Sequence, residues 1–270
     1  MRRPIPSARR VILVCALGAL GCGVLAACRP DTVQVAFHPP VGARYRYQVD
    51  VTKARTIQLG SDGPQRTVDD ARLEADEIVL ASGPQGIRVQ VELRRAGSAP
   101  RKFVVLFDRA AQLTAVESVE GLPASVLEPF GLSEIFPAAA GAPPPRPLAA
   151  GEQWTIDDHL ALAGSAPARL RGSGRLESFG VVGGRKVASI RSSTRLPVST
   201  QSPLSGGQLA LQGVESTLSN ATRELADGAV EEASSTTTGN YQVTLTPGDQ
   251  GPPVTGTLTI EVRSKTKRVR

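Results

Sequence analysis

The chain has 270 residues, a formal net charge of +6 and three cysteines, all within the first 28 residues. Four of its 31 basic residues are arginines in the first ten positions, and without them 27 basic residues face 25 acidic ones. A nucleic-acid-binding protein needs a clustered basic face, so we expect no nucleic-acid partner. Residues 29–270 contain no cysteine, which excludes an internal disulfide in that part of the chain.

The first 27 residues have the pattern of an export signal. The basic start MRRPIPSARR is followed by Val11–Ala27, a run of apolar and small residues without a charge. Such a basic start, apolar middle and small-residue end predict a cleaved secretory signal rather than a transmembrane anchor, because 17 residues barely span a bilayer. Arg9–Leu13 also resembles a twin-arginine motif, so the general secretory and twin-arginine routes both stay open.

The signal ends in Leu25, Ala26, Ala27 and Cys28. These four residues resemble the lipobox of bacterial lipoproteins. The resemblance implies that Cys28 carries a thioether-linked diacylglycerol after cleavage behind Ala27. Because two acyl chains hold a protein stably at a bilayer, we expect a lipid anchor on the outer, extracytoplasmic face of the cell membrane. Residues 28–40 would then be a membrane tether.

Residues 41–120 predict a first antiparallel β half. RYRYQVDV and IRVQVELR alternate apolar and polar side chains, which is typical of half-buried strands. The second of these strands, residues 87–94, would point Ile87, Val89, Val91 and Leu93 inward. SDGP and SGPQG supply turns, and KFVVLFD pairs with QLTAVESV. ARLEADEIVL continues as a strand, although its acidic residues would also suit a helix.

Residues 121–150 form a connector rich in proline and alanine, with one or two helical turns expected around Val126–Phe136. Residues 151–270 predict a second antiparallel half with turns at VGGR and ADG and a loop at TPGDQGPP. Its Ser/Thr-rich strands are expected to face water. The basic end RSKTKRVR reads as outward charges on a last strand, or as a contact with anionic headgroups. The fold class is thus mostly β: two antiparallel meanders that form curved sheets or half-barrels, joined by a proline-rich connection.

Two short motifs extend this interpretation. Gly42–Tyr45 fits G-x-x-Y, and Gly151–Trp154 fits G-[DE]-x-W after the proline-rich stretch. The arrangement resembles uncharacterised secreted lipoproteins of actinobacteria-like bacteria that carry a domain of unknown function. That resemblance implies paired meanders and supplies no catalytic residues.

The search for chemistry yields one candidate group, Asp157, Asp158 and His159. Consecutive residues point away from one another in a strand or a helix, so the three cannot converge on one metal, and a polar loop or helix start is the simpler interpretation. Gly172–Arg175 lacks the helix that follows a phosphate-binding loop. Trp154 is expected to fill the core, with stacking on a sugar or lipid as its alternative. The only other histidine, His38, falls in the tether.

These observations favour a membrane-anchored, non-catalytic lipoprotein without a cofactor, in which curled sheets bind a lipid-like or other hydrophobic ligand. Mycobacterial lipid-carrying lipoproteins and the periplasmic lipoprotein carrier share that general plan, as a fold-level analogy. The alternative is a structural or protein-interaction module of the cell envelope. A cavity on an apolar concave face would favour the first interpretation, and a filled core the second.

Overall fold

The structure is a computed structural model that describes residues 31–111, 113–119, 122–123, 143–160, 168–204, 206–248 and 251–269. The chain divides into two units, Met1–Asp31 and Thr32–Arg270, and the second holds the sheet described below. Cys28, the signal and the expected helical turns around Val126–Phe136 lie outside the described residues.

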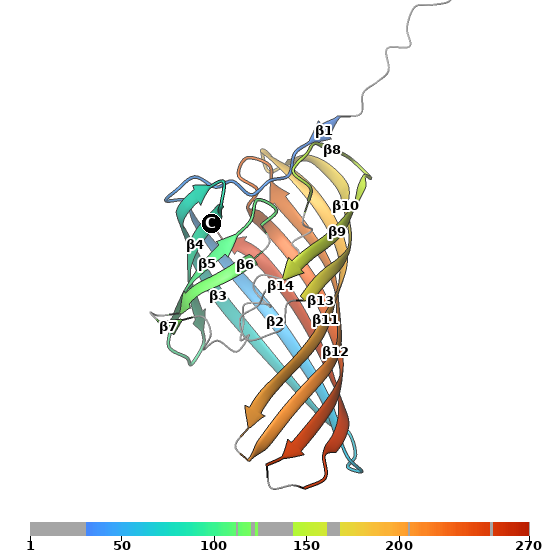
Figure 1. Ribbon diagram of the computed structural model, residues 1–270. Helices are drawn as coiled ribbons and strands as arrows, with labels where there is room; N and C mark the ends of the chain where they lie inside the picture. The colour runs from blue at the N-terminus through green and yellow to red at the C-terminus, as the bar shows by residue number, and fades with distance from the viewer. Residues whose placement is uncertain are drawn as a thin grey trace, which may run out of the picture. The chain divides into compact units, whose positions relative to one another are not determined.

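The described residues of the second unit form an antiparallel sheet of twelve strands and a small two-stranded sheet (Figure 1). The strands are β1 (Thr32–Val33), β2 (Arg44–Leu59), β3 (Gln65–Gly83), β4 (Gly86–Arg95), β5 (Arg101–Phe107), β6 (Leu113–Val119), β7 (Leu122–Pro123), β8 (Leu148–Ala149), β9 (Gln153–Leu160), β10 (Ala168–Val182), β11 (Arg185–Leu204), β12 (Gly207–Glu224), β13 (Val230–Pro247) and β14 (Val254–Val269). The order in the large sheet is β7-β6-β5-β4-β3-β2-β14-β13-β12-β11-β10-β9. The prediction of a mostly β, antiparallel, curved architecture is confirmed.

The two meanders join into one sheet because the first long strand pairs with the last. β14 runs antiparallel to β2 along most of its length, with Ser264 opposite Val51 and Thr266 opposite Val49. The sequence left open whether the halves share a sheet, and this pairing answers that question. The sheet does not close, since β7 and β9 are its two ends among the described strands.

The turns lie where the sequence placed them. SDGP connects β2 to β3, and ADG lies between β12 and β13. Gly183 and Gly184 join β10 to β11 with φ angles of 57° and 79°, which suit glycine in a two-residue hairpin. ARLEADEIVL is part of β3, so the strand interpretation of that segment is confirmed.

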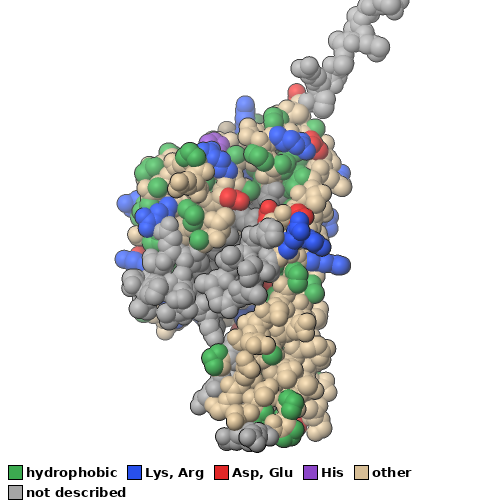
Figure 2. Space-filling model, viewed as in Figure 1, with side chains coloured by type: hydrophobic (Ala, Val, Ile, Leu, Met, Phe, Trp, Pro, Cys, Tyr) green, Lys and Arg blue, Asp and Glu red, His purple; other side chains and the backbone are tan. Residues whose placement is uncertain are grey.

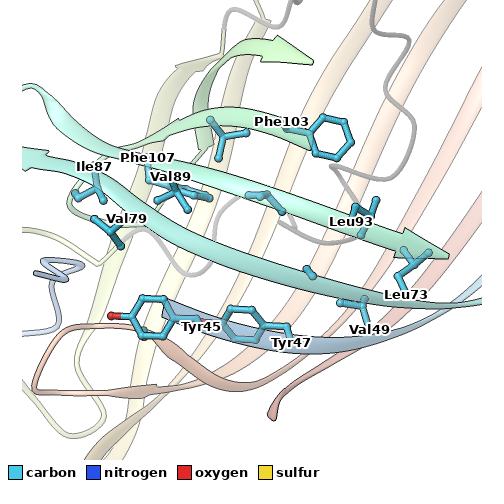
Figure 3. Close-up of a cluster of buried hydrophobic side chains, with 14 of the residues drawn as sticks. Tyr45, Tyr47, Val49, Leu73, Val79, Ile87, Val89, Leu93, Phe103 and Phe107 are labelled. Atoms are coloured by element: carbon cyan, nitrogen blue, oxygen red, sulfur yellow. The ribbon is translucent and has the colours of Figure 1, made fainter. Parts of the chain in front are cut away.

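One hydrophobic core covers the inner face of the first half (Figure 3). β4 directs Ile87, Val89, Val91 and Leu93 to this face, as the alternating pattern predicted. Phe103 and Phe107 on β5 extend the cluster, and Tyr45 and Tyr47 on β2 border it (Figure 3).

A second core lies on β9–β11 and includes Trp154, which is buried as the core-filling interpretation predicted. Gly174 on β10 pairs with Trp154, and a Cβ built there would lie 2.2 Å from the indole. Gly172 and Gly174 therefore belong to a strand, and glycine at position 174 makes room for the ring.

The Ser/Thr-rich strands differ from the prediction that they face water. Seven hydroxyl residues of β11–β14 are buried: Ser192, Thr194, Thr217, Ser219, Ser235, Ser264 and Thr266. Ser192 bonds Ser219 at 2.7 Å and Ser235 bonds Ser264 at 2.8 Å. A short hydroxyl side chain can be buried when a neighbouring strand supplies its partner.

The expected tether is also shorter than predicted. β1 pairs with β8, and Val35 and Phe37 are buried in the two cores. The Phe37 amide donates to the Arg109 carbonyl at 2.7 Å, and the His38 amide donates to the Asp227 carbonyl at 2.8 Å. Val35–His38, which we call the strap, therefore bridges the β5–β6 turn of one half and the β12–β13 turn of the other.

Candidate functional site

The candidate residues of the sequence lie apart from one another. Cys28 is outside the described residues. Asp157, Asp158 and His159 belong to β9, so the loop or helix start expected there is wrong. The exposed Asp157 carboxylate accepts hydrogen bonds of 2.5 and 2.7 Å from Arg169 on β10. His38 is exposed, with Nδ1 2.7 Å from the Ala36 carbonyl oxygen.

The described ranges contain no group of three or more His, Cys, Asp or Glu residues arranged to hold a metal ion. They also contain no helix that is long and apolar enough to cross a membrane.

A cavity of about 60 Å³ lies inside the sheet, under the strap. Phe37 of the strap and Phe107 of β5 line it, and their rings meet edge to face at 5.7 Å. Polar residues line it from four strands: Tyr47 on β2, Glu77 on β3, Arg223 on β12 and Thr266 on β14. The site thus draws on both halves of the sheet and on the strap.

Arg223 is the unusual member of this group. Its side chain is fully buried, and its three guanidinium nitrogens have no hydrogen-bond partner among the described residues. Burial lowers the pKa of Arg223 to about 10, partly offset by the negative charge of Asp108, so the group stays charged at neutral pH. An uncompensated buried charge is among the costliest features a fold can hold.

Glu77 and Tyr47 are buried beside the same cavity, and no hydrogen bond joins either side chain to another residue in the described part of the chain. Burial raises the pKa of Glu77 to about 8, against the field of Arg268, which lowers it. Burial also raises the pKa of Tyr47 well above its usual value. At neutral pH both groups are therefore mainly neutral and able to donate a hydrogen bond.

Arg268 on β14 is a half-buried cation that, unlike Arg223, has acidic partners. Its Nη1 lies 3.0 Å from Glu224 and 2.8 Å from Glu231, and its guanidinium stacks 4.7 Å from the centre of the Tyr45 ring. Arg185 reaches the same two carboxylates at 3.2 and 2.5 Å. Two arginines and two glutamates therefore balance each other, while Arg223 has no such hydrogen-bonded partners among the described residues.

The sequence search overlooked Arg223 and Glu77, although a signal for Glu77 existed. Leu73, Ala75 and Val79 alternate on the inner face of β3, and the same period places Glu77 among them. The signal for Arg223 is weaker, because Thr217 and Ser219 precede it in the same register and Ser/Thr-rich strands predict a face toward water.

A second concavity, a depression of about 850 Å³, is lined by residues of β2, β3 and β11–β14, among them the buried Ser235 and Ser264, and it shares Ser219 and Asn220 with the first cavity. Exposed charged side chains border it, among them Arg72, Arg191, Arg263 and Lys265. Arg72 pairs with Asp50 at 2.7 Å, and Arg263 pairs with Glu261 at 2.6 Å. Arg263 and Lys265 are exposed, as the sequence predicted for the basic end of β14, whereas Arg268 of that end is half-buried and paired with Glu224 and Glu231. On the face that Figure 2 shows, charged side chains gather toward the end of the molecule near the strap, and few lie at the opposite end.

No protein family, curated protein or solved structure matches this chain. The assignment of a function therefore rests on the residues of the sites described above.

Proposed function

We propose that this protein is a lipid-anchored lipoprotein of the extracytoplasmic face of the cell membrane, and that its folded body binds an amphipathic ligand without transforming it. The anchor part of the proposal rests on the lipobox-like residues 25–28. The binding part rests on the cavity that Phe37, Phe107 and Arg223 line together, because the guanidinium nitrogens of Arg223 have no hydrogen-bond partner among the described residues. Pockets with apolar walls and a few convergent polar groups are typical of small-molecule sites.

The anchor is tested by Cys28→Ala. Without a thiol, no thioether to diacylglycerol forms, so the protein should leave the membrane fraction or remain unprocessed. Fractionation and intact-mass measurement of both proteins from the native host check this. A Cys28→Ala protein that is correctly cleaved and still in the membrane fraction contradicts the lipoprotein assignment.

Ligand binding is tested by native mass spectrometry of the mature protein extracted from its own host's membranes in a nonionic detergent. We expect an added mass beyond the anchor that disappears after organic extraction. Protein that carries the mass of the anchor alone contradicts the binding function.

The larger depression supports a second candidate, an interaction module of the cell envelope. Its mixed charges and open volume of about 850 Å³ suit a polar polymer or a partner protein better than a lipid. Cross-linking in intact cells, with Arg191→Glu as the variant, separates this candidate from the first. A cross-linked partner that is present with the wild type and absent with Arg191→Glu supports the interaction module. An identical pattern of cross-linked products in both proteins contradicts it.

A further inference from the structure

We propose that Arg223 is the anchor point for an oxyanion, a carboxylate or phosphate group of the ligand, with the Glu77 carboxyl and the Tyr47 hydroxyl as its neighbouring hydrogen-bonding groups. The inference rests on the proposed binding function and names the chemical class of the ligand.

The charge of Arg223 carries the argument. A guanidinium is not deprotonated under ordinary conditions, so burial cannot be relieved by losing the proton. Breaking a buried ion pair leaves an isolated charge that costs several kcal/mol, and folded proteins avoid this arrangement. Three buried nitrogens without partners beside a cavity therefore call for an anion in that cavity. A planar guanidinium binds carboxylate and phosphate through two parallel hydrogen bonds.

None of the nearby carboxyl groups is the anion that Arg223 requires. Glu77 lies beside the cavity but is mainly protonated at neutral pH. Asp108 acts on Arg223 only through its field, since no hydrogen bond joins the two. Glu224 and Glu231 are occupied by Arg185 and Arg268. The protein thus supplies neutral donors around Arg223 and no hydrogen-bonded counter-ion among the described residues.

The size and location of the cavity indicate which part of the ligand it can hold. A volume of about 60 Å³ accommodates an oxyanion or a few waters, whereas pockets for whole drug-sized ligands measure about 300–1,000 Å³. A head group, not an acyl chain, therefore fits beside Arg223. Phe37 of the strap lines this cavity, and Val35 follows Cys28 by seven residues, which span at most about 25 Å. In the anchored protein, the oxyanion site would lie within reach of the bilayer.

The test is isothermal titration of the mature full-length protein in a nonionic detergent with sodium phosphate, sodium acetate, dodecanoate, dodecyl phosphate and the uncharged dodecanol. We expect the charged chains to bind and dodecanol to fail. Binding of acetate or phosphate as tight as that of the chain-bearing anions would identify a free ion as the ligand. Binding of dodecanol as tight as dodecanoate would overturn the proposal, because the anion would then contribute nothing.

Arg223→Met should weaken binding of the charged chains about 30-fold or more, as expected when one partner of a buried charge pair is removed. Arg223→Lys keeps the charge but loses the planar fork, so we expect an intermediate loss. Arg195→Met, on the exposed face of β11 and outside the lining of both cavities, is the matched control and should bind like the wild type. The melting temperature of Arg223→Met without ligand should equal or exceed that of the wild type, since a buried charge is gone.

Equal affinity in wild type and Arg223→Met overturns the proposal. If Arg223→Met does not fold, equal affinity in Arg223→Lys and wild type overturns it.

The two proposals fail separately. A co-purified ligand that Arg223→Met retains leaves the binding function intact and removes the oxyanion site. An empty wild-type protein contradicts the proposed binding of a native ligand, and the oxyanion site itself still stands if that protein binds dodecanoate through Arg223.

Discussion

The two halves of the sheet use different inner faces on the same backbone architecture. In β2–β5 the buried positions are apolar or aromatic apart from Glu77, and the apolar ones form one continuous cluster. In β11–β14 the central buried positions hold Ser and Thr, linked across strands by hydroxyl hydrogen bonds. The two kinds of surface meet where β2 pairs with β14, and Val51 lies opposite Ser264.

The apolar half mainly stabilises the fold, whereas the polar half supplies the cation of the proposed binding site. An apolar cluster stabilises the fold through buried area, which does not depend on direction. On a polar inner face each buried group needs a hydrogen-bond partner. Arg223 departs from this rule among the described residues, and the departure marks it as a candidate binding residue. The cavity lies where the first core meets the second half's polar strand ends, and it takes aromatic walls from one half and the cation from the other.

The largest expected effect comes from the apolar half. Phe103 is 1% exposed in the first core. Phe103→Ala should lower the free energy of unfolding by about 3–5 kcal/mol, because it removes buried area and leaves a void. Urea denaturation followed by circular dichroism measures this, with Lys102→Ala on the opposite face of β5 as the control. A loss below about 1 kcal/mol would mean that this cluster does not stabilise the sheet.

The next effect is a pH dependence that starts from Glu77. Its folded pKa of about 8 lies above its ordinary value of 4.5, so the folded state keeps a proton that the unfolded state releases. Stability is therefore fully present below about pH 4.5 and falls by about 1.4 kcal/mol per pH unit until about pH 8. Glu77→Gln removes this slope, so the difference in unfolding free energy between the variant and wild type should grow by about 3 kcal/mol from pH 5.5 to pH 7.5.

Urea titrations of both proteins at these two pH values measure the difference. Glu74→Gln, on the exposed face of the same strand, controls for the general effect of removing a carboxylate. A difference between Glu77→Gln and wild type that stays constant with pH would show that Glu77 titrates as an ordinary surface carboxyl.

The polar half predicts a smaller, coupled effect. Ser235 and Ser264 are buried and bonded to each other at 2.8 Å. Ser235→Ala or Ser264→Ala alone should cost about 1–3 kcal/mol, since each leaves one buried hydroxyl without its partner. The double variant should lie closer to the wild type than the sum of the single losses, and a double-mutant cycle by urea denaturation measures this coupling. Strict additivity would show that the two hydroxyl groups act independently.

The strands and turns could be predicted from the sequence because their signals are local. The alternation in residues 87–94 and the glycines at 183 and 184 each specify structure within a few positions. The pairing of β2 with β14 could not be predicted, because it joins residues some 200 positions apart and many antiparallel registers satisfy the same pattern.

The site was harder to predict than the fold. Whether a serine strand faces water depends on the neighbouring strand, and the partner of Ser235 is 29 residues away. The burial of Val35 and Phe37 was missed because two prolines follow them and suggested a linker. Arg223 is informative only when its missing partners are known, and these are a property of the folded molecule. The lipid attachment at Cys28 stays a prediction from the sequence.

The smallest expected effect concerns a feature that the halves share. Gly42 and Gly151 precede β2 and β9, and both have φ angles of 82°. Their amides donate to the neighbouring strand at matching places, Gly42 to Val79 at 2.8 Å and Gly151 to Leu176 at 2.6 Å. Each half thus begins with a glycine in the left-handed conformation, and the amide of that glycine donates a hydrogen bond to the second strand of its meander.

Gly42→Ala and Gly151→Ala should each lower the free energy of unfolding by about 1–2 kcal/mol, the cost of placing an L-residue in the left-handed region. Side-chain crowding does not account for this loss, because a Cβ at Gly42 meets nothing within 4 Å and one at Gly151 only an arginine side-chain nitrogen at 3.7 Å. Gly63→Ala, in an open turn without positive φ, is the control and should change stability by less than about 1 kcal/mol. Equal losses at the two sites would show that both halves depend on one kind of entry turn, although their inner faces differ. Unequal losses would mean that the shared geometry stabilises only one meander, and that the halves differ in their local turns as well as in their cores.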